Sequence, residues 1–456
     1  MFRYFITVIC LTYTATQAQS LPPLTPAQKV YGLSRFWQEV NYNFVYLNKI
    51  NRHAWDSAYI AMIDIVQKTT NDYEYFRELQ RFCALLKDGH TNIYPPNHPP
   101  VFNTMFGDYR LFIKNVGGKA IITHINSSKK NVLPPGSEIL EVNGLPTTEY
   151  LKKYVSPYIS SSTDYVLEDW SINNLLKGLE NESYLIKVRR PQKKDTSLTI
   201  IHSRSTETDT YPPLVSRRLL DFRWLDSNIG YLALNSFSDP AIDSLFQVCL
   251  PELYKAKGLI IDLRSNGGGN SNIAIAILEH LTPERVLYGS RSSSRLHIPA
   301  HKAWGAFVQP KDTINSEWNR QSYLSLHDAY YHVFGSSKHK VKLKSKRILV
   351  PIVLLIGHET ASAAEDFLIY ADQQKHMTKI GEPTFGSTGQ PYSFTLPGGG
   401  SARVCTKKDT YPDGREFVGY GIQPDIFVQP TVSDFLENKD SALEKGIAFL
   451  RQKIRP

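Results

Sequence analysis

The chain has 456 residues, of which 41% are hydrophobic and 12% aromatic, and its formal net charge is +9 at pH 7. This composition excludes a disordered chain, and the length predicts two or three packed domains. The positive charge has no pattern typical of a nucleic-acid-binding module, so we expect no nucleic-acid partner.

Residues 1–18 have the features of a secretory signal peptide. Arg3 supplies positive charge, residues 4–15 are apolar but too few to span a bilayer, and residues 16–18 (Thr-Gln-Ala) form a small-x-small cleavage site. We therefore expect an exported protein, periplasmic or extracellular, without membrane insertion. Its remaining cysteines, Cys83, Cys249 and Cys405, are too widely spaced for a disulfide framework and predict buried free thiols.

Residues 19–100 are predicted to form an N-terminal helical domain. Thr25 to Gln28 reads as a capping box with a proline at the first helical position. A second capping box, Asn71 to Glu74, opens another helix, which we expect Gly89 to end. His90 then lies in the turn that follows.

Residues 106–202 are predicted to form a PDZ-like domain. Two strands, 111–113 and 120–122, are joined through a Gly-Gly turn, and residues 136–144 form a strand that ends in an Asn-Gly turn. This last stretch resembles the corresponding strand and turn of PDZ domains, which bind chain termini by adding a peptide strand to a sheet edge.

Residues 205–456 alternate buried strands with helices, as α/β cores do. The apolar runs 229–234, 258–263 and 348–356 are typical of strands covered on both faces. The less regular residues 281–346 are interpreted as an insertion bordering a cleft. The following lysines recur at every second position and predict one face of a solvated edge strand: Lys338, Lys340, Lys342, Lys344 and Lys346.

Ser362 is the candidate nucleophile. It follows a buried strand and opens a helix, where free amide groups and the helix dipole favour a developing oxyanion. The same serine, with Glu365 three residues later, also fits an ordinary capping box. A second buried strand ends in Gly267, Gly268 and Gly269, which let the backbone approach a reacting carbonyl.

Taken together, these blocks resemble the carboxyl-terminal processing peptidases, which include the tail-specific proteases and the tricorn core protease. The matching blocks, in chain order, are Asp88 to Thr91, the PDZ-like segment, Ile229 to Tyr231, Asp262 to Gly269, Thr360 to Glu365, Gly381 to Gly386 and Gly421 to Asp425. The resemblance implies a multi-domain α/β fold with a helical domain, a PDZ-like domain and a ClpP/crotonase-like protease core built on a mixed sheet.

By the same resemblance, Ser362 is the nucleophile, and the amides of Ala363 and Gly268 form the oxyanion hole. Gly268 is preferred to Gly267 because many relatives have proline, which lacks an amide hydrogen, at the latter position. The Ser-Lys branch has its lysine 25 residues after the nucleophile, where this chain has Ser387. A Ser-Lys mechanism is therefore not expected.

The tricorn-like branch implies a histidine base instead, and His90 matches it. That branch has serine immediately before the histidine, where this chain has Gly89, so the group that orients the ring is left open. Glu416 is the nearest candidate for the acidic member, with Asp413 as the alternative. His358, four residues before Ser362, is a competing base that lies on the wrong block.

These assignments predict an exported serine endopeptidase that cleaves extended or unfolded polypeptides, with free carboxyl termini as one recognition element and no cofactor or metal. The alternative is a catalytically silent protein on the same scaffold that binds peptides or apolar ligands, because the family also resembles the repeats of retinoid-binding proteins. A surface adhesin or scaffold has no sequence feature of its own. The sequence does not determine the oligomeric state.

Overall fold

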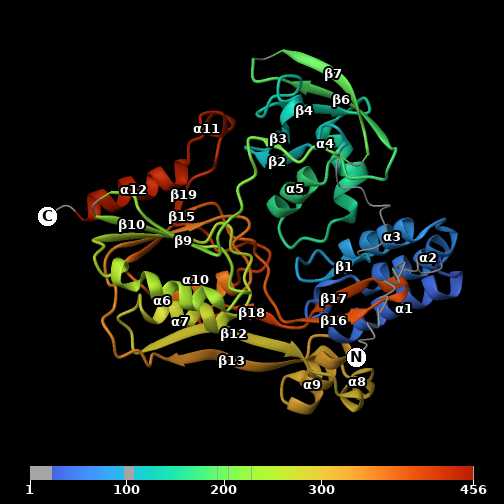
Figure 1. The fold of residues 1–456 in the computed structure, drawn as a ribbon. Coiled ribbons are helices and arrows are strands. Elements are labelled where there is room, and N and C mark those ends of the chain that lie inside the picture. Colours follow the sequence, from blue (N-terminus) through green and yellow to red (C-terminus); the bar gives the residue numbers. More distant parts are fainter. Residues whose placement is uncertain (1–22, 97–106, 193, 204, 227, 455–456) are drawn as a thin grey trace, which may run out of the picture.

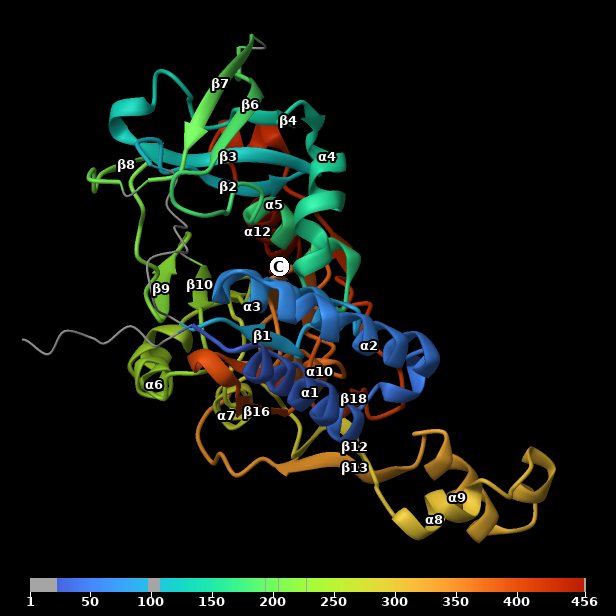
Figure 2. The same ribbon diagram turned by 90° about the vertical axis from the view of Figure 1, so that its right-hand side faces the viewer.

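The computed structural model describes residues 23–96, 107–192, 194–203, 205–226 and 228–454 (Figure 1). The expected signal peptide lies outside these residues. The described chain forms a helical module, a module around a twisted antiparallel sheet, and a large α/β core, which lie around a common centre (Figures 1 and 2). No helix in the described part is long and apolar enough to cross a membrane.

The helical module begins where the capping box predicts. Gln28 N–H donates to Thr25 Oγ1 at 3.3 Å, and Asn71 Oδ1 accepts from the amide of Glu74 at 2.9 Å. The helices are α1 (Pro26–Asn43), α2 (Arg52–Lys68) and α3 (Asp72–Ala84). The last of these ends at Ala84, not at Gly89 as predicted.

Two strands from far along the chain complete this helical module. β1 (Asn92–Tyr94) pairs antiparallel with β17 (Ser401–Cys405), which pairs with β16 (Pro391–Thr395). Phe394 and Val404 are buried in the same apolar cluster as the helices, and Figure 1 shows both strands beside them. His90 is therefore attached to a sheet made largely by the C-terminal half of the chain.

The second module is built on an antiparallel sheet in the order β2-β3-β4-β6-β7. Both predicted hairpin turns are present, with positive φ at Gly117 and Gly118 and at Asn143 and Gly144. The elements are β2 (Phe112–Val116), β3 (Lys119–Asn126), β4 (Glu138–Val142), β5 (Leu145–Pro146), α4 (Thr147–Tyr150), α5 (Asp164–Asn173), β6 (Ser183–Arg189), β7 (Asp195–Ile201) and β8 (Thr210–Tyr211).

The core is a six-stranded sheet in the order β19-β15-β14-β11-β10-β9, parallel except for β9. One face packs on α6, α7 and α10, and the other on α12. The elements are β9 (Leu220–Trp224), β10 (Ile229–Leu234), α6 (Ala241–Leu253), β11 (Gly258–Asp262), α7 (Ser271–Glu279), β14 (Ile352–Ile356), α10 (Ala363–Ala371), β15 (Met377–Gly381), β19 (Ile426–Phe427), α11 (Val432–Leu436) and α12 (Ser441–Lys453).

The segment interpreted as an irregular insertion is instead a long hairpin that carries two helices away from the rest of the molecule (Figure 2). Its elements are β12 (Val286–Arg295), α8 (Pro299–Gly305), α9 (Glu317–Leu326) and β13 (Tyr331–Lys340), and β12 also pairs with β18 (Lys408–Thr410). β13 is an edge strand, but it ends at Lys340. The last three of the alternating lysines follow the strand, so that prediction is only partly right.

Candidate active site

Ser362 lies on a sharp turn between the buried strand β14 and helix α10. Its backbone has φ 55° and ψ −119°, a region that costs a residue with a side chain about 1–3 kcal/mol. Strain of this kind is held at nucleophile elbows, where a strand-to-helix turn presents a serine hydroxyl above a sheet. The cavity that Ser362 lines has a volume of about 570 Å³.

A buried carboxyl group holds this turn in place. Glu365 accepts hydrogen bonds from the Ser362 amide at 3.1 Å, the Thr384 hydroxyl at 2.6 Å and the Gly386 amide at 2.8 Å. Burial raises the pKa of Glu365 to about 8, although the three donors oppose that shift. The sequence indicated only a capping role, whereas the structure makes this side chain the link between the nucleophile turn and the loop after β15.

The glycine turn after β11 packs directly on the Ser362 turn. A Cβ on Gly268 would lie 2.7 Å from the Ser362 Cβ and 2.8 Å from the Ala363 nitrogen, so only glycine fits there. Asn266, which sequence reasoning missed, binds both sides of this contact. Its backbone carbonyl accepts from the Ala361 amide at 3.0 Å, and its Oδ1 accepts from the Gly268 amide at 2.9 Å.

The two expected oxyanion donors differ in whether their amides are already hydrogen-bonded. The Ala363 amide is the first of α10 and has no hydrogen-bond partner among the residues that the structure describes. The Gly268 amide is engaged by Asn266 and would have to leave it to face a substrate. Gly267 and Gly269, on either side, are the members of the turn that line the cavity.

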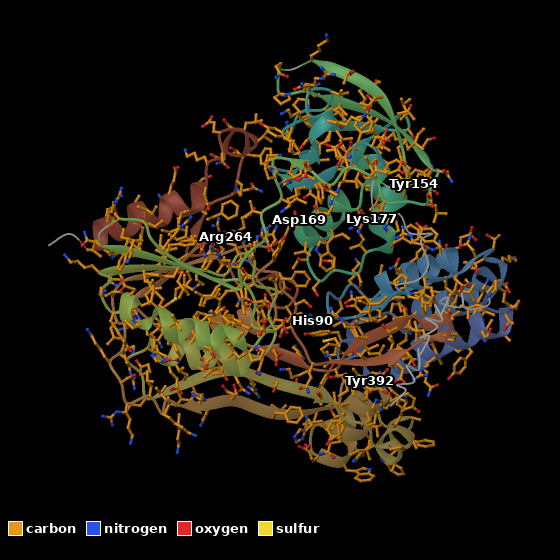
Figure 3. The ribbon with its side chains drawn as sticks, viewed as in Figure 1. His90, Tyr154, Asp169, Lys177, Arg264 and Tyr392 are labelled. Atoms are coloured by element: carbon orange, nitrogen blue, oxygen red, sulfur yellow. The ribbon has the colours of Figure 1, made fainter. Side chains whose placement is uncertain are left out.

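His90 lines the same cavity as Ser362, although the two residues are far apart in the sequence. It lies near the centre of the molecule, between the modules (Figure 3). Its Nδ1 is 2.8 Å from the hydroxyl of the buried Ser387, at the position where the Ser-Lys branch has its lysine. The sequence left open which group orients the His90 ring, and the structure places the Ser387 hydroxyl there.

Steric contacts explain why a glycine, and not a serine, precedes His90. A Cβ on Gly89 would lie 2.6 Å from the Phe385 ring and 3.1 Å from the Ser387 Cβ, so a serine does not fit. The turn is instead held from the neighbouring module, because the Gly89 amide donates to Ser162 Oγ at 2.9 Å and Ser160 Oγ donates to the Asp88 carbonyl at 2.8 Å.

The imidazole of His90 is neutral in this environment. Burial lowers its pKa to about 3, and the positive charges of Arg403 and Lys407 add to that effect. A neutral ring has one nitrogen that can accept a proton, which is the state a general base needs.

Neither of the predicted acidic residues contacts His90. Glu416 forms an ion pair with Lys408 at 2.6 Å and lines a different cavity, beside Tyr46 and Lys49. Asp413 pairs with Arg415 at 2.7 Å on the surface. The partner of His90 Nδ1 is a hydroxyl instead, and the structure does not bring a Ser-His-Glu set together.

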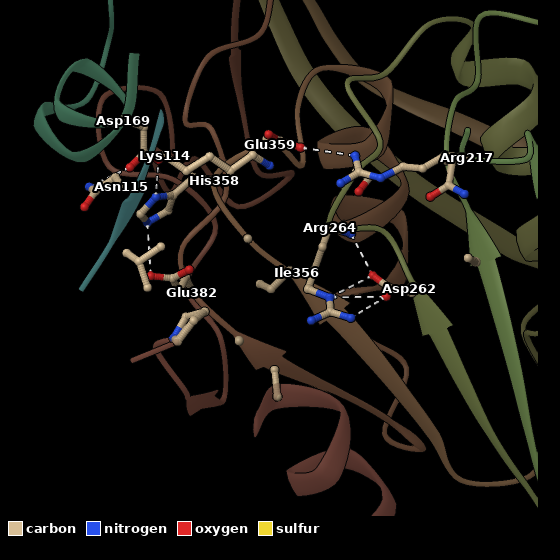
Figure 4. A pocket seen from close by; sticks show the side chains of 18 of the residues that line it. Lys114, Asn115, Asp169, Arg217, Asp262, Arg264, Ile356, His358, Glu359 and Glu382 are labelled. Atoms are coloured by element: carbon tan, nitrogen blue, oxygen red, sulfur yellow. Dashed lines mark hydrogen bonds and ion pairs between the residues drawn. The ribbon is translucent and has the colours of Figure 1, made fainter. Parts of the chain in front are cut away.

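His358, the competing base, joins α5 to the core. Its Nδ1 is 2.7 Å from Asp169 Oδ2 and its Nε2 is 3.8 Å from Glu382 (Figure 4). Its ring also stacks on Tyr165. The ring is thereby held between carboxylates where a second cavity, of about 700 Å³, meets the Ser362 cavity, and it lines both. Both ring nitrogens thus face acidic groups.

Comparison with known proteins agrees with this architecture. The family model described as peptidase family S41 matches residues 228–428, which include the glycine turn and Ser362. The match covers somewhat less than half of the chain, and over these residues the chain is similar to this family of peptidases. The predicted carboxyl-terminal processing peptidase family is thereby confirmed.

Curated relatives carry the corresponding name. The carboxy-terminal-processing protease of Bartonella bacilliformis is 24% identical over 237 residues, which are 51% of this chain and 45% of the relative. The carboxy-terminal processing protease CtpA of Bacillus subtilis is 26% identical over 208 residues, 44% of this chain and 35% of the relative. The chain thus spans about half the length of these relatives or less.

Solved structures show the same fold. Mature CPAF has a TM-score of 0.66 at 14% identity, with 93% of this chain and 96% of that chain covered. A crystal structure of mature CPAF with lactacystin has a TM-score of 0.67 at 14% identity, with 94% and 99% covered. The arrangement of helices and sheets is therefore similar to that of mature CPAF.

Proposed function

We propose that the chain is a serine endopeptidase that cleaves extended or unfolded polypeptides with Ser362 as nucleophile and His90 as general base. The observation that carries this proposal is that the strained Ser362 turn and the neutral His90 ring line one cavity, from opposite halves of the sequence. Acyl transfer by a serine requires a nucleophile and a base within reach of each other in one site.

The hydrogen bond to Ser387 selects the tautomer that the reaction needs. With Nδ1–H donating to the Ser387 hydroxyl, Nε2 of His90 carries the lone pair. It takes the proton of Ser362 Oγ as that oxygen attacks the scissile carbonyl, and then gives it to the leaving amine. A water molecule, deprotonated by the same nitrogen, hydrolyses the acyl-enzyme and frees Ser362.

The developing oxyanion is assigned to the Ala363 amide and one amide of the glycine turn. The free first N–H of α10 lies where the helix dipole favours negative charge. Gly268 serves as the second donor if substrate draws its amide from Asn266 Oδ1. The contact of Gly268 with the Ser362 turn supports this assignment.

The domain and location assignments belong to the same proposal. Residues 106–202 form a PDZ-like domain that presents polypeptide to the cavity, next to the helical domain of residues 19–100 and the peptidase core of residues 205–456. The protein is exported after cleavage of residues 1–18. The hairpin turns, the antiparallel sheet and α5 support the PDZ-like assignment.

A fluorophosphonate probe tests the central assignment. We expect labelling of the mature protein, its loss in Ser362→Ala, and a drop of at least about a hundredfold in labelling rate in His90→Gln. Circular dichroism and thermal melting of each variant show whether it is folded. A folded wild type that never reacts would favour the silent binding protein instead.

A further inference from the structure

Strands β16 and β17, which form a sheet with β1, contribute Pro391 and Arg403 to the lining of the Ser362 cavity. Arg403 lies on β17, the central strand, where it pairs with Asn92 on one side and Ser393 on the other. Its neighbours Ala402 and Val404 are buried in the core of the helical module. Because side chains alternate along a strand, Arg403 faces the opposite side, where it lines the cavity.

The guanidinium group is held by neutral partners. Its Nε donates to Asn92 Oδ1 at 2.8 Å, its Nη2 donates to the Gly89 carbonyl at 3.4 Å, and it lies 5.6 Å from the centre of the Tyr94 ring. No carboxylate of the described residues forms an ion pair with the guanidinium. Its Nη1 donates no hydrogen bond to the described residues. The cation is thus fixed in direction and has no ion-pair partner among the described residues, although the buried Asp88 lies near enough to interact with it electrostatically.

The other charges around this cavity are already paired. Glu359 forms an ion pair with Arg217 at 3.7 Å, and Lys407, which follows β17, pairs with Asp409 at 3.1 Å. Arg403 is the only arginine or lysine among the described residues that line the cavity. An anionic ligand that enters the cavity therefore meets one unpaired, partly desolvated guanidinium, a strong partner for a carboxylate.

We propose that Arg403 is a specificity-determining residue that binds a carboxylate of the substrate beside the Ser362 hydroxyl. The carboxylate belongs either to an aspartate or glutamate side chain near the scissile bond or to the free carboxyl terminus of the substrate. This inference rests on the proposed peptidase function and adds the chemical class of substrate.

Carboxylate binding also affects the base. After burial itself, the charge of Arg403 does most to hold the pKa of His90 below its ordinary value. A carboxylate that pairs with the guanidinium offsets this charge and makes His90 a stronger base. The preferred substrate is thus expected to have a higher kcat as well as a lower KM.

The test compares matched peptides. One series places Glu or Gln at each position around the cleaved bond, and a second compares a free carboxyl terminus with its amide. We expect the wild type to prefer one carboxylate at least about tenfold in kcat/KM and Arg403→Gln to lose that preference. Arg403→Lys retains part of the preference, and Arg320→Gln on α9 is the control. An equal loss of kcat/KM for every peptide would show that Arg403 has only a structural role.

A binding measurement keeps the proposal testable apart from catalysis. Calorimetry of the same peptides with Ser362→Ala and with the double variant Ser362→Ala, Arg403→Gln measures the carboxylate preference without hydrolysis. We expect a preference of about tenfold in Kd that the second substitution removes. Equal affinity for acid and amide peptides in Ser362→Ala would overturn the carboxylate site, whereas failure of probe labelling would overturn only the peptidase function.

Discussion

At the scale of single residues, the contact between His90 and Ser387 decides whether the base is usable. Ser387→Ala removes the only partner that the described residues offer His90 Nδ1, so the tautomer and ring orientation are no longer selected. We expect kcat to fall by about 10- to 100-fold with KM nearly unchanged. Steady-state kinetics measures this, and a melting curve shows that the loss is not unfolding. Unchanged kcat would assign ring orientation to another group.

The low pKa of His90 predicts an unusual pH profile. Burial and two cations depress it, so the ring stays neutral as the pH falls through the ordinary value near 6.5 towards about 3. The acid limb of kcat/KM is therefore expected well below pH 6.5, as far as the folded state survives there. In Arg403→Gln a depressing charge is absent, so the limb moves to higher pH. A limb at 6.5 in both proteins would contradict this.

The same depressed pKa also affects stability. The unfolded chain binds a proton at this histidine more readily than the folded one, so the stability that neutral His90 contributes is present above pH 6.5. It is lost as the pH falls from there towards about 3. Denaturant unfolding of wild type and His90→Gln across this pH range measures the difference in their free energies of unfolding. Its pH dependence can then be compared with the acid limb of kcat/KM.

At the scale of elements, His358 connects helix α5 to the core. Burial opposes its charge, but the hydrogen bond to Asp169 and the charge of Glu382 outweigh burial and raise its pKa above the ordinary value. This contribution to stability is fully present below about pH 6.5, the unfolded value, and is lost as the pH rises through the raised folded value.

We therefore expect His358→Gln to lower the free energy of unfolding more at pH 6 than at pH 9. Asp169→Asn, which keeps the size of the side chain, is the matched variant and is expected to show the same trend. Denaturant titrations at the two pH values measure both. An equal loss at both pH values would mean that the ring acts through packing on Tyr165 and not through its charge.

At the scale of the whole molecule, the helical module depends on strands from the far end of the chain. Phe394, Leu396 and Val404 belong to its buried core. We expect residues 23–96 expressed alone to lack a cooperative thermal transition by circular dichroism. The same residues joined by a flexible linker to 390–406 are expected to regain one. A cooperative transition of the isolated segment would show that the helices are sufficient.

Several features followed from the sequence alone because local contacts determine them. The caps at Thr25 and Asn71, the turns at Gly117 and Asn143, and the strand-turn-helix that presents Ser362 each depend on residues within a few positions of one another. The order of the motifs along the chain was enough to indicate the peptidase family, because motif order does not depend on how the modules pack.

Tertiary structure alone decided the partners of those residues. Ser387 reaches His90 across 297 positions, and Arg403 reaches Gly89 across 314, and sequence spacing carries no information about such contacts. Ser387 did carry one signal, because it stands where relatives have lysine. The sequence indicated Glu416 for a role in which the structure places a hydroxyl, since the nearest acidic residue in a sequence block need not be near in space. Packing and burial, not spacing, select which polar groups meet in the cavity.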